Sequence, residues 1–215
     1  GNIALAIGIN EFVAKRAGKF FQSCMILPTF ISYIAVSFIV YALLKNQTGL
    51  VNRLIVSMGG QSINFYISPN KWPVILLLVN IWKGIGYGSV LYLSVLTGID
   101  PALYEAAALD GANAWQKMWY VTLPMLVPMV VIMTLLGLGS IMNSDTGLFY
   151  QVTRNAGALY PTTQVLDSYV LNAIMTSTNF STTAATTFYQ SVIGSVMVIG
   201  TNCIVRKFAP ENALF

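Results

Sequence analysis

The stretch WPVILLLVNIWKGIGYGSVLYLSVLTGI, residues Trp72–Ile99, contains one charged side chain, Lys83, in 28 residues. A helix needs about 20 apolar residues to cross the hydrocarbon core of a bilayer, and this run is longer than that. Three further runs reach about the same length: Phe20–Leu44, Leu123–Met142 and Thr187–Val205. The four runs predict membrane-spanning helices and essentially no sheet, because lipid does not satisfy the open edges of strands.

The composition of the chain is typical of a protein that faces lipid. Of its 215 residues, 56% are hydrophobic and 8% are charged, whereas a soluble domain carries about 25% charged residues. We therefore expect an all-α, polytopic transmembrane helical bundle that forms one transmembrane domain over residues 1–215. Gly1–Ile9 is apolar but too short to span a membrane, and we interpret it as the inner end of a helix whose start is missing. Cys24 and Cys203 lie in apolar runs, where we expect packed, unpaired thiols.

Lysine and arginine residues give a weak indication of orientation. Six lie on one side of the predicted spans and four on the other, and cytoplasmic loops carry the excess of positive charge in membrane proteins. This places Asp100–Thr122 in the cytoplasm and Asn143–Thr186 outside. The first group is Lys15, Arg16, Lys19, Lys117, Arg206 and Lys207, and the second is Lys45, Arg53, Lys71 and Arg154. The net charge of +4 therefore concerns orientation, and we expect no nucleic-acid partner.

Catalytic chemistry is poorly supported by the residues present. The chain has no histidine, which is the commonest general base and metal ligand. It also has no G-x-x-x-x-G-K-[ST] phosphate-binding loop, so we do not expect it to hydrolyse ATP by itself. The residues offer neither a Cys/His metal-binding spacing nor a catalytic triad. We expect no enzyme activity, no metal site and no cofactor.

The segment between the second and third predicted spans, DPALYEAAALDGANAWQKMWYVTLP (Asp100–Pro124), predicts a short helix. Asp100 is a suitable N-cap, Pro101 suits the first helical position, and Gly111 can adopt the left-handed conformation that ends a helix. The three alanines at 106–108 would let another backbone approach closely. On the residues alone, this segment is either a docking helix for a partner or an ordinary capped loop helix.

The same segment resembles a known signature. Glu-Ala-Ala, three residues, Gly, nine residues, an aliphatic residue, one residue and Leu-Pro is typical of the permease subunits of bacterial ABC importers. In this chain the pattern falls on Glu105, Ala106, Ala107, Gly111, Val121, Leu123 and Pro124, with Asp110 before the glycine. Val121 stands where isoleucine is commoner. The resemblance implies that residues 100–124 form a cytoplasmic coupling loop whose helix lies in a cleft of a separate ATPase subunit.

Most of the chain is similar to carbohydrate-type permeases, especially those that handle complex oligosaccharides. The likeness is carried by Leu27-Pro28, Gly49–Asn52 and the ending Arg206–Phe215. It implies the type-I ABC importer permease fold with its N-terminal helix missing, in a multi-pass protein of the bacterial plasma (inner) membrane. It also implies a second permease subunit in a heterodimer, two ATP-binding subunits and an extracytoplasmic solute-binding protein, which together import sugars by alternating access.

An alternative function is that of an ion-coupled secondary carrier for a small polar solute. Such a carrier needs intramembrane carboxylates or broken helices as ion sites. Aspartate and glutamate are absent from all four predicted spans, which disfavours this alternative. A purely structural membrane assembly factor is a third possibility, and it would not explain the signature in residues 100–124.

Lys83 is the only ionisable residue near the middle of a predicted span, and such residues are usually functional. Helical spacing places it on one face with Asn80, Gly84, Tyr87 and Gly88. Two interpretations remain open. Either Asn80, Lys83 and Tyr87 line the substrate pathway, or the face is a packing seam in which the glycines allow close contact and Lys83 snorkels outward.

The segment Asn143–Pro161 is polar and carries aromatic and charged side chains, among them Asp145, Tyr150, Arg154 and Tyr160. It is expected on the external side of the membrane. It either reaches into the mouth of the pathway, contacts a substrate-delivery protein, or is an ordinary external loop.

Overall fold

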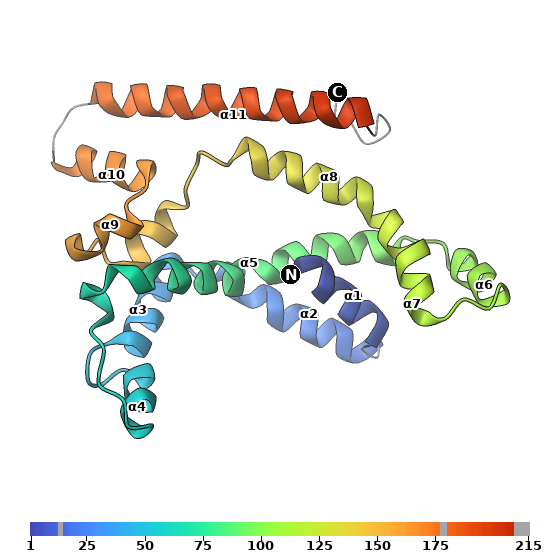
Figure 1. Cartoon of the computed structure of the whole chain (residues 1–215), viewed down its shortest axis with the longest axis horizontal. Helices are drawn as coiled ribbons and strands as arrows, with labels where there is room; N and C mark the ends of the chain where they lie inside the picture. Colours follow the sequence, from blue (N-terminus) through green and yellow to red (C-terminus); the bar gives the residue numbers. More distant parts are fainter. Residues whose placement is uncertain (13–14, 177–179, 209–215) are drawn as a thin grey trace. The chain divides into compact units, whose positions relative to one another are not determined.

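The computed structural model describes residues 1–12, 15–176 and 180–208 of the chain. Every regular element in these ranges is helical and none is a strand, which confirms the predicted fold class (Figure 1). The α-helices are α1 (Asn2–Phe12), α2 (Lys15–Phe30), α3 (Tyr33–Leu44), α4 (Leu50–Ser57), α5 (Trp72–Thr97), α6 (Pro101–Leu109), α7 (Ala114–Lys117), α8 (Leu123–Gly139), α9 (Tyr160–Thr163), α10 (Leu166–Thr176) and α11 (Phe180–Phe208). Short 3-10 helices cover Phe65–Ile67 (η1), Pro69–Lys71 (η2) and Gly157–Leu159 (η5), and π-helical turns cover Met118–Thr122 (η3) and Gly147–Val152 (η4).

Within the described residues, three continuous helical stretches are long and apolar enough to cross a membrane: Pro69–Thr97, Ala114–Gly139 and Thr183–Lys207. They contain most of the predicted spans 72–99, 123–142 and 187–205, and these three predictions are confirmed. The third stretch belongs to α11, which begins at Phe180 rather than at Thr187, so serines and threonines before residue 187 are helical as well.

The prediction of one unbroken span over Phe20–Leu44 is wrong. The helices on either side of residues 31 and 32 are bent by 97° relative to one another. Pro28 lies inside α2, where its ring cannot donate a backbone hydrogen bond. Ser32 then starts α3 afresh, because its backbone is extended and its side chain accepts a hydrogen bond from the amide of Ala35 at 3.3 Å.

The chain divides into two compact units, each with its own core. Unit 1 comprises Gly1–Pro28, Gly84–Ser140 and Gly194–Phe215, and unit 2 comprises Thr29–Lys83 and Ile141–Ile193. The core of unit 1 contains Ala6, Ile7, Tyr92, Leu96 and Leu126. Cys24 and Cys203 belong to unit 1 and are free thiols, but both are exposed, so the prediction that they are packed is wrong. They lie on helix faces turned away from that core.

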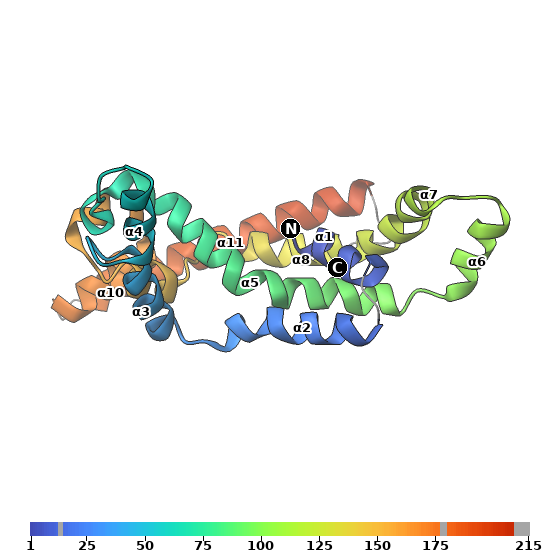
Figure 2. The ribbon, with the colours of Figure 1, turned by 90° about the horizontal axis from the view of Figure 1, so that it is seen from below.

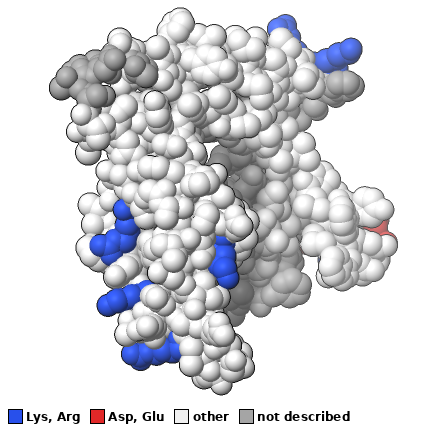
Figure 3. All heavy atoms as spheres, turned by 60° about the vertical axis from the view of Figure 1, so that its left-hand side comes forward, with Lys and Arg blue, Asp and Glu red and all other residues white. Residues whose placement is uncertain are grey.

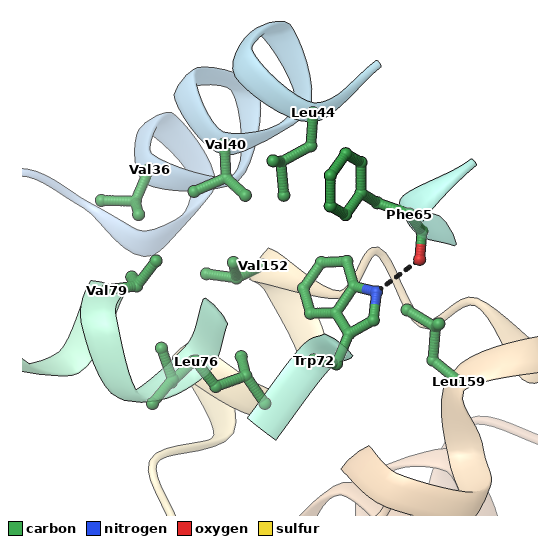
Figure 4. Close-up of a cluster of buried hydrophobic side chains, with 10 residues drawn as sticks. Val36, Val40, Leu44, Phe65, Trp72, Leu76, Val79, Val152 and Leu159 are labelled. Carbon is green, nitrogen blue, oxygen red and sulfur yellow. Dashed lines mark hydrogen bonds between the residues drawn. The ribbon is translucent and has the colours of Figure 1, made fainter. Parts of the chain in front are cut away.

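The core of unit 2 joins α3 to the first half of α5 (Figure 4). Val36, Val40 and Leu44 recur every four residues and so share one face of α3. Trp72 lies opposite them and is fully buried, and its indole Nε1 donates a hydrogen bond to the carbonyl oxygen of Phe65 at 2.8 Å. This bond lets the large ring be buried without an unpaired polar atom.

Unit 1 contains a close helix contact on α5, but at a different glycine from those predicted. Figures 1 and 2 show α2 alongside α5, and a side chain at Gly86 would overlap the backbone of Met25 in α2. Gly84 has open space around its α-carbon, and Gly88 lies against the side chain of Asn2 rather than against another backbone. The predicted packing seam of Gly84 and Gly88 is therefore replaced by a contact at Gly86, because α2 approaches a different face of α5.

Candidate functional site

The segment 100–124 forms a short helix that is separate from α5, as predicted. Helix α5 ends at Thr97, and α6 runs from Pro101 to Leu109. Asp100 is the N-cap, and its carboxylate accepts a hydrogen bond from the amide of Ala102 at 2.9 Å. Pro101 follows at the first position, where its missing amide hydrogen costs nothing. Local sequence alone therefore starts this helix.

The end of α6 is a left-handed turn at Gly111, with a φ of 77°. The amide of Gly111 donates to the carbonyl of Ala108 at 3.1 Å, and the amide of Ala112 donates to the carbonyl of Ala107 at 2.9 Å. These two bonds define a Schellman motif, which satisfies carbonyls that the end of a helix leaves open. A β-carbon added at Gly111 would meet nothing within 4 Å, so the conformation, and not crowding at that atom, favours glycine here.

A second cap starts the chain segment that leads back into the membrane. The side chain of Asn113 accepts from the amide of Gln116, and the side chain of Gln116 accepts from the amide of Asn113, at 2.9 and 2.8 Å. This capping box begins α7, which continues through the π-helical turn η3 into α8. Residues 100–124 thus consist of two helical segments, each with its own start signal, around one glycine turn.

The side chain of Tyr104 connects these two segments. Its hydroxyl lies 3.0 Å from the hydroxyl of Thr122, which is fully buried. Nothing in the sequence indicated this pair, because the partners are 18 residues apart and neither belongs to the signature. The bond links α6 to the end of the π-helical turn η3, directly before α8.

The eight signature residues form one group in α6 and the turn after it and a second group in η3 and at the start of α8. Glu105, Ala106, Asp110 and Gly111 are exposed, Ala107 is half-buried, and no residue of α6 is buried. Val121 is half-buried in η3, Leu123 packs against the core of unit 1, and Pro124 is exposed at the second position of α8. The first group therefore offers a surface, and the second attaches that surface to the membrane helix.

The exposed face of α6 combines small, acidic and apolar groups. Leu109, which no part of the signature includes, has 91% of its surface exposed. Leu109 adds its apolar surface to that of the neighbouring exposed alanines. Glu105 and Asp110 add two carboxylates, and α6 itself contains no basic residue. The surface is suited to an apolar groove with basic groups at its margin.

Lys83 lies inside the break between α2 and α3. Its Nζ donates hydrogen bonds to the carbonyl oxygens of Thr29 at 2.7 Å and Ile31 at 2.8 Å, and it lies 4.7 Å from the centroid of the Tyr33 ring. In return, the hydroxyl of Thr29 donates to the carbonyl of Lys83 at 2.8 Å. Lys83 is 9% exposed, so the interpretation that it snorkels outward is wrong. Its amine supplies donors to carbonyls that the helix break leaves open.

Asn80 and Tyr87, which share the predicted pathway face with Lys83, are both exposed. The hydroxyl of Tyr33 donates to the carboxylate of Asp145 at 2.5 Å, so the structure groups Lys83 with Tyr33 and Asp145 instead. The sequence offered no signal for this grouping, because its members come from three distant segments. Contact of Asn80, Lys83 and Tyr87 with a substrate stays a prediction.

Comparison with known proteins agrees with this architecture. Residues 3–210 match the family described as binding-protein-dependent transport system inner membrane component. The chain is 31% identical to the polygalacturonan/rhamnogalacturonan transport system permease protein YteP of Bacillus subtilis over 98% of its own length. It is 28% identical to the lactose transport system permease protein LacF of Rhizobium radiobacter over 89% of its length. The chain spans 65% of YteP and 64% of LacF.

Solved structures show the same fold. A chain of a bacterial ABC transporter involved in the import of the acidic polysaccharide alginate superposes with a TM-score of 0.90 at 30% identity. The match covers 97% of the present chain and 72% of that chain. The transporter in complex with an alginate pentasaccharide-bound periplasmic protein gives a TM-score of 0.89, also at 30% identity, over 96% of the present chain and 71% of that chain. The chain has the ABC importer permease fold, and it belongs to the binding-protein-dependent transport system inner membrane components, as a multi-pass protein of the inner membrane.

Proposed function

We propose that the chain is the membrane-spanning permease subunit of an ATP-driven, binding-protein-dependent importer of sugars or oligosaccharides. The observation that carries the proposal is α6, a separately capped helix that exposes most of its alanine, leucine and acidic side chains. The names of YteP and LacF, which are permeases for a polygalacturonan and for lactose, support the substrate class. In this proposal residues 1–215 act as one transmembrane permease domain, and residues 100–124 are its coupling loop.

The ATPase partner is proposed from the chemistry of this surface, and the other partners are proposed from the family to which the chain belongs. A separate ATPase subunit takes up α6 in a cleft, with basic groups opposite Glu105 and Asp110. Two such subunits, a second permease and an extracytoplasmic binding protein complete the assembly, which works by alternating access. The alginate transporter forms a complex with a periplasmic protein that carries an alginate pentasaccharide, and this complex supports the last of these partners.

The test replaces Gly111 by tryptophan in the assembled transporter. A bulky residue at the turn would keep α6 out of the ATPase cleft, so we expect the ATPase to detach or its hydrolysis to lose its link to transport. Gly59→Trp is the matched control, because Gly59 also has a positive φ, of 84°, and also has no atom within 4 Å of an added β-carbon. Both substitutions strain a left-handed turn, but only one lies in the signature.

Copurification of the ATPase and ATP-dependent uptake are measured for both variants at equal amounts of protein in the membrane. If Gly111→Trp and Gly59→Trp behave alike, the loop is not the coupling element. ATP-independent uptake that instead follows an ion gradient would support a secondary carrier and refute the proposal.

A further inference from the structure

Arg154 forms the exposed end of a stack of aromatic rings in unit 2. Its guanidinium carbon lies 4.2 Å from the centroid of the Tyr41 ring. The Tyr41 ring is 5.5 Å from that of Tyr66, which is 5.0 Å from that of Trp72, both in edge-to-face arrangements. Since Trp72 is fully buried in the core of unit 2, the stack holds Arg154 in a fixed position. Stacking covers the face of a guanidinium and leaves the donors at its edge for a ligand.

The backbone at Arg154 is held in a conformation that side chains rarely adopt. Arg154 and Asn155 have φ angles of 57° and 49°, and neither is glycine. The amide of Asn155 donates to the carbonyl of Tyr150 at 3.0 Å, and the side chains of Asn155 and Asn172 exchange hydrogen bonds of 2.8 and 3.0 Å. Two successive strained residues persist only where surrounding structure holds them, which is common at ligand sites.

A cavity of about 290 Å³ lies beside the guanidinium. Ile34 and Phe38 form an apolar wall, and Ser37, Gln151 and Asn155 supply polar groups, with Arg154 itself in the lining. The volume is close to the lower limit, about 300 Å³, for sites that bind small molecules. An apolar wall with a few polar groups and one cation suits a single charged sugar unit.

No carboxylate in the described part of unit 2 neutralises Arg154. The unit contains five basic and two acidic residues. Asp145 accepts hydrogen bonds from the hydroxyl of Tyr33 and the amide of Leu148, and Asp167 accepts from the amide of Ser144 and from Gln190. At the lower left of Figure 3, several lysine and arginine side chains lie near one another, with no acidic side chain visible among them. The described lining of the cavity therefore has a cation and no anion.

We propose that the cavity beside Arg154 binds a carboxylate of a uronate-containing oligosaccharide. The guanidinium edge and a sugar carboxylate form a bidentate pair, and the apolar wall receives a face of the ring. This inference rests on the proposed transport function and specifies its substrate class as acidic. Alginate, the acidic polysaccharide of the structurally similar transporter, and the polygalacturonan in the name of YteP have this chemistry.

The test compares uptake of tetragalacturonate and of its methyl ester by the complete transporter in proteoliposomes with saturating delivery protein. The delivery protein is the same for every variant of this chain. Its preference for acid or ester therefore cancels when the ratio of the two uptake rates is compared between variants. Loss of one charge-assisted hydrogen-bonding partner predicts that Arg154→Gln lowers the acid-to-ester ratio by about tenfold. Arg53→Gln is the matched control, because Arg53 is an exposed cation of unit 2 outside the cavity, and its ratio should stay unchanged.

If Arg154→Gln leaves the acid-to-ester ratio unchanged, the proposal is overturned. An equal loss of both uptake rates would then show that Arg154 contacts the delivery protein or supports the fold. If the wild-type transporter imports neither compound, the proposed function still holds for other sugars, and calorimetry with tetragalacturonate then tests the site directly. Binding of tetragalacturonate to the purified complex that Arg154→Gln abolishes would support the site, and absence of binding would overturn it.

Discussion

Replacing Lys83 by methionine tests whether this side chain holds the break between α2 and α3. Methionine keeps an unbranched apolar stem but removes the nitrogen that bonds the carbonyls of Thr29 and Ile31. Each buried carbonyl left without a partner costs about 1–3 kcal/mol, so the two together predict a loss of about 2–6 kcal/mol in the free energy of unfolding. For a chain of this length, 1 kcal/mol lowers the melting temperature by roughly 2–4 °C. We therefore expect a decrease of at least roughly 4 °C.

The melting temperature is measured on the purified chain in detergent by tryptophan fluorescence, to which the buried Trp72 contributes. Lys45→Met is the matched control, since Lys45 is an exposed lysine of the same unit and the same substitution should leave the melting temperature almost unchanged. A Lys83→Met variant that melts like Lys45→Met but no longer transports would refute this reasoning. It would show that Lys83 acts in the substrate pathway rather than on the helix break.

Two further predictions concern the packing of each unit. Gly86→Ala should lower the free energy of unfolding by about 1–3 kcal/mol, because the new methyl group overlaps the backbone of Met25. Gly84→Ala, where space is open, should raise it by about 0.5–1 kcal/mol, and the reverse order in denaturation would contradict the observed contact. Burial raises the pKa of Tyr66 from 10.0 to about 12, although Arg154 acts in the opposite direction. The neutral phenol of Tyr66 therefore contributes its full stabilisation of the folded state below pH 10 and loses it between pH 10 and about 12. Over that pH range the melting temperature should fall less for Tyr66→Phe than for the wild type.

The sequence was sufficient to predict a structural feature wherever the cause of that feature lies within one segment of the chain. Apolar runs longer than the bilayer thickness predicted three spans, because hydrophobic length is a property of one segment. The start and end of α6 were also predictable, since Asp100 and Gly111 act on backbone groups within a few residues of themselves. The signature in the same segment identified the family, because its spacing is contained in consecutive residues.

The sequence was insufficient where the cause is a contact between distant segments. Phe20–Leu44 has no charge between its end residues and a helical composition, so nothing in it requires a bend of 97°. Pro28 and Ser32 allow an interruption at this place, but the donor that stabilises the break, Lys83, is 54 residues away from Thr29. The same limit applies to Tyr104 and Thr122, whose bond links α6 to the end of η3.

Arg154 shows most clearly which properties can be predicted from the sequence and which depend on the tertiary structure. Its positive charge and its place in a polar segment were visible in the sequence, but its neighbours were not. It stacks on Tyr41, which packs against Tyr66 and through it against Trp72, and this arrangement requires that α3 and α5 pack around the core of unit 2. Hydrophobic length and helix caps act within one segment, and the residue types alone therefore decide which helices form. Side chains from separate helices meet only through packing, and the tertiary structure therefore decides which of them make a site.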